Sequence, residues 1–369
     1  MVSSASATGG VANYVATARE VAARFGGAWP AALSRMLFAK ALYGLSAVEY
    51  GLYSLHSKPF RKLADYRTKK QTTALFARVN PEQERPRVED KLVFHRLCLA
   101  AALPVPTLHA VLSIRKPGST TDYPVLERFE DVLEFFRSFD EIRLILKPQC
   151  DALGTGVRFV NLRGGKPFDI QGGAIDIKSF SAGLDFDMQR DDYLIQTFVT
   201  PHPEMASLGS GKALGTFRIV TYLDGGGVQM LYALTRIPSG NNVHDNFSGG
   251  NTGNLIASLD PETGRVGPAF GRRNKAFSRL VESFDSNPDT GRPIAGQRVP
   301  QWDEIRAVVH KAVETFRELP FLGWDFALST EGVVIIEANS NPDIVGAQVS
   351  SGLGARELLK PLYQRYQDA

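Results

Sequence analysis

The sequence predicts an α+β protein. Two observations support this fold class: residues 11–80 show only helical periodicity, and the region after residue 100 alternates short helices with strands. The composition, 43% hydrophobic and 22% charged among 369 residues, is that of a folded globular chain and excludes a long disordered one. A chain of this length has room for two or three structural units.

The composition also indicates the cellular compartment and excludes one class of partner. Two cysteines, Cys98 and Cys150, are too few for a disulfide framework or a four-thiolate zinc site. No run of about 18 apolar residues could span a bilayer, and the first ten residues lack the pattern of a secretion signal. The net charge of +3 is too small to argue for nucleic acid. We expect an intracellular, cytoplasmic protein that binds no nucleic acid; the oligomeric state stays open.

The N-terminal region is basic and helical. Apolar residues at three- and four-residue spacing predict amphipathic helices over 11–25 and 31–55, with a turn between them. Residues 1–80 hold 11 Lys and Arg against three acidic residues, a net +8, so the remainder carries −5. A solvated helical face explains such an excess, and contact with a membrane surface or an acidic partner explains it as well.

The next segments alternate in type. A loop rich in proline and charge over 79–90 marks a boundary between units, and a helix over 90–103 begins at the capping residue Asp90. A strand over 104–112, a helix over 131–139 and a strand over 143–149 follow.

The first cluster with chemical potential lies around Lys147. The strand over 143–149 carries Lys147 to a loop with Gly154 and Gly156, and a second strand over 157–162 follows. Glycines let backbone N–H groups approach an anion, and lysine supplies a point charge for phosphate. The order of the parts is not that of a P-loop. A plain glycine-rich hairpin is the alternative.

The second cluster covers residues 193–205. An apolar strand reaches Gln196 and breaks at Pro201 and Pro203, and free backbone groups at such an end suit a flat heterocycle such as adenine. Glu204 lies near enough along the chain to accept hydrogen bonds from ribose hydroxyls. An ordinary edge strand is the alternative.

The third cluster contains two arginines in a hairpin. Arg218 lies in the first strand and Arg236 at the end of the second, on either side of a glycine-rich turn, and a loop rich in asparagine and glycine that includes Asn246 follows. An arginine inside an alternating strand is costly to bury without an anion. A salt-bridged or solvent-facing arginine is the alternative.

The fourth cluster is a hairpin over 323–343 with acidic residues. A three-residue loop, Thr330 to Gly332, would pair Asp325 with Glu337 and place Asn339 on the same face as Glu337. Two facing carboxylates repel each other, and a hard cation such as Mg²⁺ would neutralise them. An exposed sheet face with acids in water is the alternative, but the apolar run before Glu337 favours the metal.

Together the clusters resemble the ATP-grasp superfamily from about Asp90 to about Asp343. Its signature is an Asp in a hairpin followed by Glu-x-Asn. The segments at 217–223, 233–236 and 245–251 are similar to those of the ribosomal-protein glutamate ligases. The segments at 90–98, 195–203 and 323–343 look closer still to the sugar-transfer-associated ATP-grasp group.

The resemblance implies a fold in which two α+β subdomains grip ATP between antiparallel sheets. It implies three units: a helical cap over 1–88, an N-terminal and lid subdomain over 89–195, and a C-terminal subdomain over 196–369 with the Mg²⁺ and ATP site. Residues 1–80 depart from the family, because they lack the α/β alternation of many N-terminal domains. Substrate identity therefore does not carry over.

The resemblance also implies roles for individual residues. Lys91 and Lys147 match phosphate-binding lysines, and residues 151–156, with Gly154 and Gly156, match the flap over the phosphates. The adenine hinge matches Gln196, Thr197, Phe198 and Val199, where Thr197 replaces a usual Glu. Residues around the γ-phosphate and the activated carboxylate match Arg218, Arg236 and Asn246, and the Mg²⁺ ligands match Asp325, Glu337 and Asn339.

Three functions fit these residues. The first is a carboxylate–amine ligase that makes an acyl phosphate from ATP and then an amide, releasing ADP and phosphate, with small-molecule carboxylate and amine substrates. The second is a kinase that phosphorylates a hydroxyl, with Asp245 or His244 as base. The third is a non-catalytic binding protein regulated by nucleotide.

Overall fold

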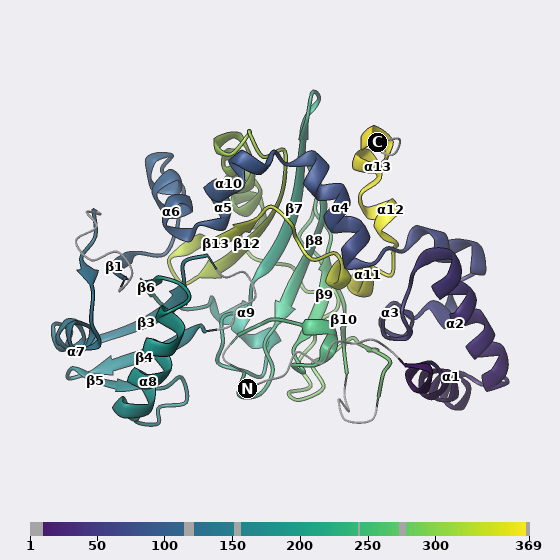
Figure 1. Cartoon of the computed structure of the whole chain (residues 1–369), viewed down its shortest axis with the longest axis horizontal. Helices are drawn as coiled ribbons and strands as arrows, with labels where there is room; N and C mark the ends of the chain where they lie inside the picture. The colour runs from purple at the N-terminus through teal and green to yellow at the C-terminus, as the bar shows by residue number, and fades with distance from the viewer. Residues whose placement is uncertain (1–9, 114–121, 151–155, 243, 273–277, 367–369) are drawn as a thin grey trace.

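The protein consists of a helical N-terminal region and two β-sheets (Figure 1). The structure is a computed structural model and describes residues 10–113, 122–150, 156–242, 244–272 and 278–366. In these ranges no helix has the length and apolar character needed to cross a membrane.

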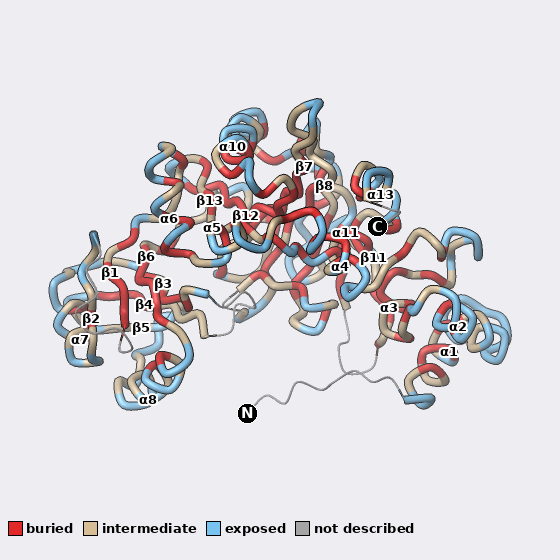
Figure 2. The backbone as a smooth tube through the Cα atoms, turned by 45° about the horizontal axis from the view of Figure 1, so that its top comes forward, coloured by how far each residue is buried: buried red, intermediate tan, exposed pale blue. Residues whose placement is uncertain are grey.

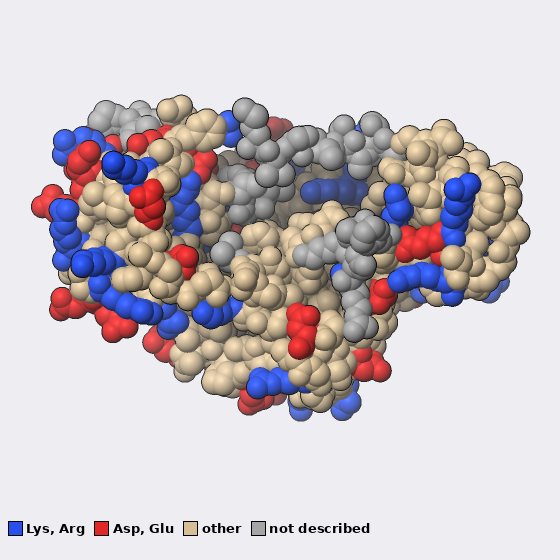
Figure 3. Space-filling model, turned by 90° about the horizontal axis from the view of Figure 1, so that it is seen from below, with Lys and Arg blue, Asp and Glu red and all other residues tan. Residues whose placement is uncertain are grey.

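The N-terminal region is helical. Its elements are α1 (Val11–Phe25), α2 (Trp29–Tyr43), α3 (Ala47–Leu52), η1 (Leu55–Ser57), η2 (Phe60–Asp65), α4 (Lys69–Val79), η3 (Glu82–Glu84) and α5 (Pro86–Glu89). In this region α1 and α2 end at glycines, and α3 and α4 begin at capping boxes. Helices α1 to α3 form the right-hand end of the molecule in Figure 1, where basic side chains border wide areas of uncharged surface (Figure 3), and α4 and α5 lie over the central part.

The predicted helix over 11–25 is confirmed, but the single helix predicted over 31–55 is wrong. Gly44 adopts φ 75°, a left-handed conformation that ends α2. Ser46 then begins α3 in a capping box, accepting from the N–H of Glu49 at 3.2 Å and donating its own N–H to the Glu49 carboxylate at 2.7 Å. Apolar spacing continues across this break, so periodicity alone conceals it.

A six-stranded sheet forms the opposite end of the molecule. Its strand order is β2-β1-β6-β3-β4-β5, and only the β1–β2 pair is parallel. The strands are β1 (Leu108–Leu112), β2 (Val125–Leu126), β3 (Glu141–Pro148), β4 (Arg158–Arg163), β5 (Lys166–Phe168) and β6 (Tyr193–Thr197). Helices α7 (Phe129–Arg137) and α8 (Ile177–Met188) cover it and share a core of its own, which includes Val132, Phe136, Leu144, Val160 and Leu184.

Helix α6 (Lys91–Ala100) enters the fold as predicted. Asp90 caps it by accepting from the N–H groups of Leu92 and Val93 at 2.9 and 3.1 Å. The predicted cap residue is thus confirmed.

A seven-stranded antiparallel sheet lies at the centre, in the order β11-β10-β9-β8-β7-β12-β13. The strands are β7 (Phe217–Asp224), β8 (Gly227–Ile237), β9 (Leu255–Leu259), β10 (Val266–Gly271), β11 (Glu282–Phe284), β12 (Phe321–Ser329) and β13 (Gly332–Asn339). The remaining elements are α9 (Pro203–Leu208), η4 (Ser248–Gly250), α10 (Trp302–Thr315), α11 (Val345–Ser351), α12 (Ala355–Leu358) and α13 (Lys360–Tyr366).

The two faces of the central sheet belong to different cores. On one face Phe217 and Ile219 pack with α10 residues such as Val309. On the other face Val220 and Tyr222 pack with the N-terminal helices and with α11 to α13. Figure 2 shows this interior as buried and the outer surfaces of α1 and α2 as largely exposed.

The helical region therefore shares a core with the central sheet, and is no loosely attached cap. We keep the three units 1–88, 89–195 and 196–369 as a proposal, although the division at 195 and 196 falls inside β6.

Candidate functional site

A row of charged residues crosses the central sheet on the face that the N-terminal helices share. Glu337 in β13, Asp325 in β12 and Arg218 in β7 are direct neighbours across the strands. The predicted pairing of Asp325 with Glu337 is confirmed, but the predicted loop is wrong. The ladder closes between Ser329 and Gly332, which leaves a two-residue turn.

A β-bulge restores the predicted pair. Asp325 pairs with Glu337 and the next residue, Phe326, pairs with Ile335, so Ile336 is the extra residue on its strand. The shorter turn shifts the register by one residue, and the bulge shifts it back.

Two arginines neutralise Asp325. Its carboxylate accepts from Arg218 through Nε and through Nη2 at 2.8 Å, and from Arg236 Nη1 at 3.0 Å. Burial alone would raise the pKa of Asp325, but the two guanidinium groups outweigh it and hold the pKa below its ordinary value. Burial likewise opposes the charge on Arg218, and Asp325 raises its pKa in return. The sequence analysis predicted that a metal cation neutralises Asp325. In the structure the guanidinium groups of Arg218 and Arg236 supply that positive charge.

Glu337 and Asn339 complete a set of hard oxygen donors. Both lie half-buried beside Asp325, and the Asn339 amide donates to Glu337 Oε1 at 3.3 Å. Among the described residues no group of three or more His, Cys, Asp or Glu could hold a metal by itself. Two carboxylates and an amide fit Mg²⁺, which takes few protein oxygens and fills its shell with water and phosphate oxygens.

The two predicted lysines come together through the start of α6 and the end of β3. The N–H of Lys91 donates to the Gln149 carbonyl at 3.0 Å, and the Gln149 side chain donates to the cap Asp90 at 2.8 Å. Lys147 Nζ reaches across to the carbonyl of the bulge residue Ile336 at 3.4 Å. This contact joins the six-stranded sheet to the central sheet.

Lys147 is held in an environment that disfavours its charge. Burial, with the nearby ammonium of Lys91, lowers the pKa of Lys147 to about 8, while Glu337 opposes the shift. A buried amine beside a second cation is well placed for an anion that would neutralise both.

At the predicted adenine hinge the backbone, and not the Thr197 side chain, is available to a ligand. The N–H groups of Thr197 and Phe198 donate to the carbonyls of Thr107 and Arg143, at 2.9 and 2.8 Å. The Thr197 hydroxyl is 2.8 Å from His109 Nε2. Within the described residues, the N–H of Val199 has no hydrogen-bond partner, so it can donate to a ligand.

The loop after β8 brings Asn246 and Asp245 to the site. Asn254 is fully buried and donates to the carbonyls of His244 and Asn246, both at 2.9 Å, which fixes the loop. Asp245 accepts from the N–H of Thr216 at 2.9 Å and from its hydroxyl. Burial raises the pKa of Asp245, and Arg236 opposes that shift.

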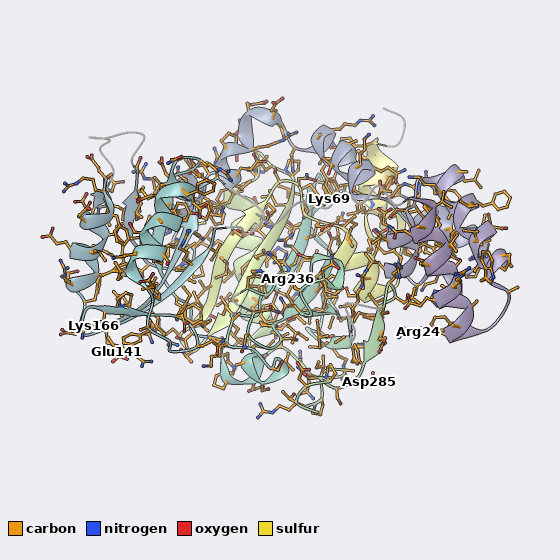
Figure 4. All side chains as sticks on the ribbon, turned by 60° about the horizontal axis from the view of Figure 1, so that its bottom comes forward. Arg24, Lys69, Glu141, Lys166, Arg236 and Asp285 are labelled. Carbon is orange, nitrogen blue, oxygen red and sulfur yellow. The ribbon has the colours of Figure 1, made fainter. Side chains whose placement is uncertain are left out.

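These residues line one cavity of about 590 Å³ between the two sheets. Figure 4 shows Arg236 at the centre of the molecule, with Lys69 of α4 above it. Twelve predicted site residues line the cavity, namely Lys91, Lys147, Gln196, Thr197, Phe198, Val199, Arg218, Arg236, Asn246, Asp325, Glu337 and Asn339.

Two predicted residues, Glu204 and Gly156, do not line it. Glu204 lies in α9, at a separate pocket of about 220 Å³ with Arg292 and Arg298, so the structure does not support a role in binding ribose. Gly156 adopts φ 79°, and a Cβ there would lie 2.4 Å from the Tyr193 hydroxyl, which explains the glycine by packing. Gly154, with most of the predicted flap, lies outside the described residues.

Other cavity residues escaped the sequence analysis. Lys69 and Glu89 come from α4 and α5 of the N-terminal region, where no motif pointed to a site. Asn341 and Asp343 lie at the end of the segment 323–343, directly after Glu-x-Asn, and Thr216 precedes β7. Only Asn341 and Asp343 could have been found, from their place directly after Glu-x-Asn.

Solved structures with similar backbones include three ligases or synthetases. The D-alanyl-alanine synthetase A of Vibrio cholerae O1 biovar eltor is 10% identical, with a TM-score of 0.41 over 76% of this chain and 62% of that one. The Bacillus anthracis D-alanine–D-alanine ligase complexed with ATP is 12% identical, with a TM-score of 0.38 over 75% and 66%. A Chryseobacterium gregarium RiPP-associated ATP-grasp ligase, in complex with ADP and a leader and core peptide, is 12% identical, with a TM-score of 0.38 over 86% and 72%.

This chain spans less than two thirds of the length of the Vibrio and Bacillus proteins. No curated protein matches it in sequence. The family described as sugar-transfer associated ATP-grasp matches residues 70–364, which is most of the chain. The predicted fold and resemblance are confirmed, and the chain belongs to the sugar-transfer-associated ATP-grasp family.

Proposed function

We propose that this protein is an ATP-dependent carboxylate–amine ligase. One observation carries the proposal: two lysines, two arginines and an Asp–Glu–Asn set converge on one cavity from α6, β3 and the central sheet. Such a cavity has cations for a triphosphate and a carboxylate, and hard oxygens for Mg²⁺.

The proposed reaction has two steps. A substrate carboxylate oxygen attacks the γ-phosphorus of ATP, the bond to ADP breaks, and an acyl phosphate forms. The amine then attacks the acyl carbon, phosphate leaves with the bonding electron pair, and the nitrogen loses a proton as the amide forms. Catalysis of this kind depends on positioning and on neutralising charge.

Each group has a role in these two reaction steps. Lys91 and Lys147 neutralise phosphate oxygens, and Arg218 and Arg236 orient the carboxylate and stabilise the transferring phosphoryl group. Asp245, with its raised pKa, accepts the proton from the amine. Glu337 and Asn339, with Asp325, would hold Mg²⁺, which when bound neutralises charge on the phosphates.

A single assay tests the chemistry. The protein is given ATP, Mg²⁺ and a panel of carboxylic acids with hydroxylamine in place of the amine, and hydroxamate, ADP and phosphate are measured. Hydroxamate formed in step with ADP and phosphate supports an acyl phosphate. ADP release with no hydroxamate for any acid, in a protein that turns over ATP, would contradict the proposal.

A kinase is the second candidate, and Asp245 favours it equally, because a base beside the cavity can also deprotonate a hydroxyl. A panel of sugars and alcohols separates the two. A kinase releases ADP without free phosphate and yields a phosphorylated acceptor.

A further inference from the structure

The exposed hydrophobic side chains of this protein gather in its basic N-terminal region. Among the described residues, seven of the eleven large hydrophobic side chains that are exposed lie between residues 11 and 60. The seven are Val11, Phe25, Trp29, Leu37, Phe38, Leu42 and Phe60.

Helix α2 presents a continuous apolar face to solvent. Leu37, Phe38 and Leu42 are 51%, 59% and 60% exposed. Positions on the same side, at three- and four-residue spacing, are all exposed and only one of them is polar: Pro30, Ala31, Ser34, Leu37, Phe38, Ala41 and Leu42. The opposite side, with Met36 and Ala39, is buried against the rest of the helical region. A helix that is apolar on its outer side as well lacks a covering partner.

Aromatic rings extend this face beyond α2. The rings of Phe38 and Phe60 meet edge to face with centroids 6.5 Å apart, and the guanidinium of Arg35 lies 5.4 Å from the centre of the Phe60 ring. At the start of α2, Arg19 stacks over Trp29 at 5.3 Å. We call the surface formed by Leu37, Phe38, Leu42 and Phe60 the apolar end face.

Cations lie around the apolar end face, and the acidic residues of α1 and α3, Glu20 and Glu49, bind other groups. Arg19, Lys40 and Arg61 are exposed and form no ion pair with a carboxylate of the described ranges. Glu20 accepts from the Arg279 N–H at 2.9 Å, and Glu49 is bound in the α3 cap. Arg19, Lys40 and Arg61 therefore leave this region with unpaired positive charge, while Arg24 and Lys62 pair with carboxylates and Lys69 lines the cavity. Figure 3 shows basic side chains at this end of the molecule.

We infer that the apolar end face docks on an anionic membrane surface, with α2 lying in the plane of the interface. Apolar side chains flanked by arginine and lysine, whose stems reach from the lipid boundary to the headgroups, are the features of an interfacial helix. At 15 residues α2 is shorter than the roughly 20 needed to span a bilayer, so it lies on the membrane rather than across it.

Charge selects this occupant over a second copy of the chain. Two apolar end faces brought together would also bring two sets of unpaired cations together, which is unfavourable, whereas anionic headgroups attract each of these cations. Docking here leaves the six-stranded sheet at the far end of the molecule (Figure 1).

Flotation of the full-length protein with vesicles tests the inference in the absence of nucleotide. A protein that does not bind the vesicles would therefore contradict the inference without contradicting the proposed function. Binding is expected to phosphatidylcholine vesicles with about 30% phosphatidylglycerol, and weakly or not at all to phosphatidylcholine alone. Leu37→Ser combined with Phe38→Ser should lower binding at least about tenfold. The matched control, Leu99→Ser with Phe186→Ser, removes two equally exposed side chains outside the face and should bind as the native protein does.

A second pair of variants tests the charge and guards against misfolding. Lys40→Gln with Arg61→Gln should weaken binding to the anionic vesicles, and Arg137→Gln with Lys166→Gln, at the far sheet, should not. The inference is overturned if the native protein fails to float with anionic vesicles, or if neither test pair differs from its control. A stable dimer that the Leu37 and Phe38 changes convert to monomer would also overturn it, by assigning the face to a second copy.

Discussion

At the scale of single residues, Arg236 is the best test of the proposed chemistry. It contacts Asp325 at 3.0 Å and lines the cavity, while Arg218 holds the same carboxylate through two further hydrogen bonds. Arg236→Ala should therefore leave the fold intact and lower the rate of ADP release roughly 10²–10³-fold. Arg292→Ala, which removes an arginine outside the cavity, should leave the rate unchanged. Near-normal turnover in Arg236→Ala would exclude Arg236 from the reaction.

The environment of Lys147 predicts how nucleotide binding depends on pH. Burial, with Lys91, lowers the pKa of Lys147 to about 8 in the free protein. Phosphate favours the charged amine, so binding must raise this pKa, and the protein takes up protons when it binds nucleotide above pH 8. The affinity for ADP should therefore fall as the pH rises above about 8.

Calorimetric titration with ADP in two buffers of different ionisation enthalpy measures that proton uptake. Lys147→Gln should bind ADP more weakly and with no uptake near pH 8. An ADP affinity of the native protein that stays constant as the pH passes through 8 would show that Lys147 does not meet the phosphates.

At the scale of elements, Asn80 ties the N-terminal region to the central sheet. It follows α4, is 1% exposed, and donates to the carbonyls of Phe321 and Ser340 at 2.6 and 2.9 Å. Its side-chain oxygen accepts from the Phe321 N–H at 3.1 Å. Asn80→Ala would leave three buried backbone groups without partners, and we expect it to lower the free energy of unfolding by about 2–4 kcal/mol.

Urea unfolding measures the loss. Gln83→Ala changes an exposed amide in the next turn and should cost little. Equal stability of the two variants would mean that the bonds of Asn80 add nothing to the native state.

Local signals predicted most elements, because capping, glycine turns and alternation act over a few residues. The helix from Asp90 and the strands that carry Lys147, Gln196 and Arg218 are where the sequence indicates. The lysines and the acidic hairpin were assigned to one site by resemblance, and the cavity brings them together.

Non-local contacts could not be predicted. The bulge at Ile336 has no sequence signal, since any residue can be the extra one in a strand. The pairing of Asp325 with Arg218 depends on β7 lying beside β12, which local patterns do not specify. The two facing carboxylates therefore led to the prediction of a metal ion. In the structure Arg218 and Arg236 neutralise one of these carboxylates, Asp325.

At the scale of the whole molecule, the cores suggest two units of stability. The N-terminal helices, one face of the central sheet and α11 to α13 share a single core. The six-stranded sheet has a separate and smaller core with α7 and α8. The cavity lies between these units, with Lys147 on one side and Glu337 on the other.

This arrangement predicts how the chain opens in urea. In hydrogen exchange followed by mass spectrometry, peptides from 45–63 and peptides that contain Val220 and Tyr222 should lose protection together, because these residues share one core. Peptides from β3 and β4 should lose protection at a lower urea concentration, because fewer apolar side chains hold them.

Nucleotide binding should then raise the stability of both units together. ADP at about 100 times its Kd stabilises the bound state by about 2.7 kcal/mol, and a ligand held between the sheets must raise the urea midpoint of both. Lys147→Gln should lose most of this shift, whereas Glu204→Ala, outside the cavity, should keep it. A shift confined to one sheet would mean that the nucleotide contacts that sheet alone, and the cavity between the sheets would no longer be the ATP site.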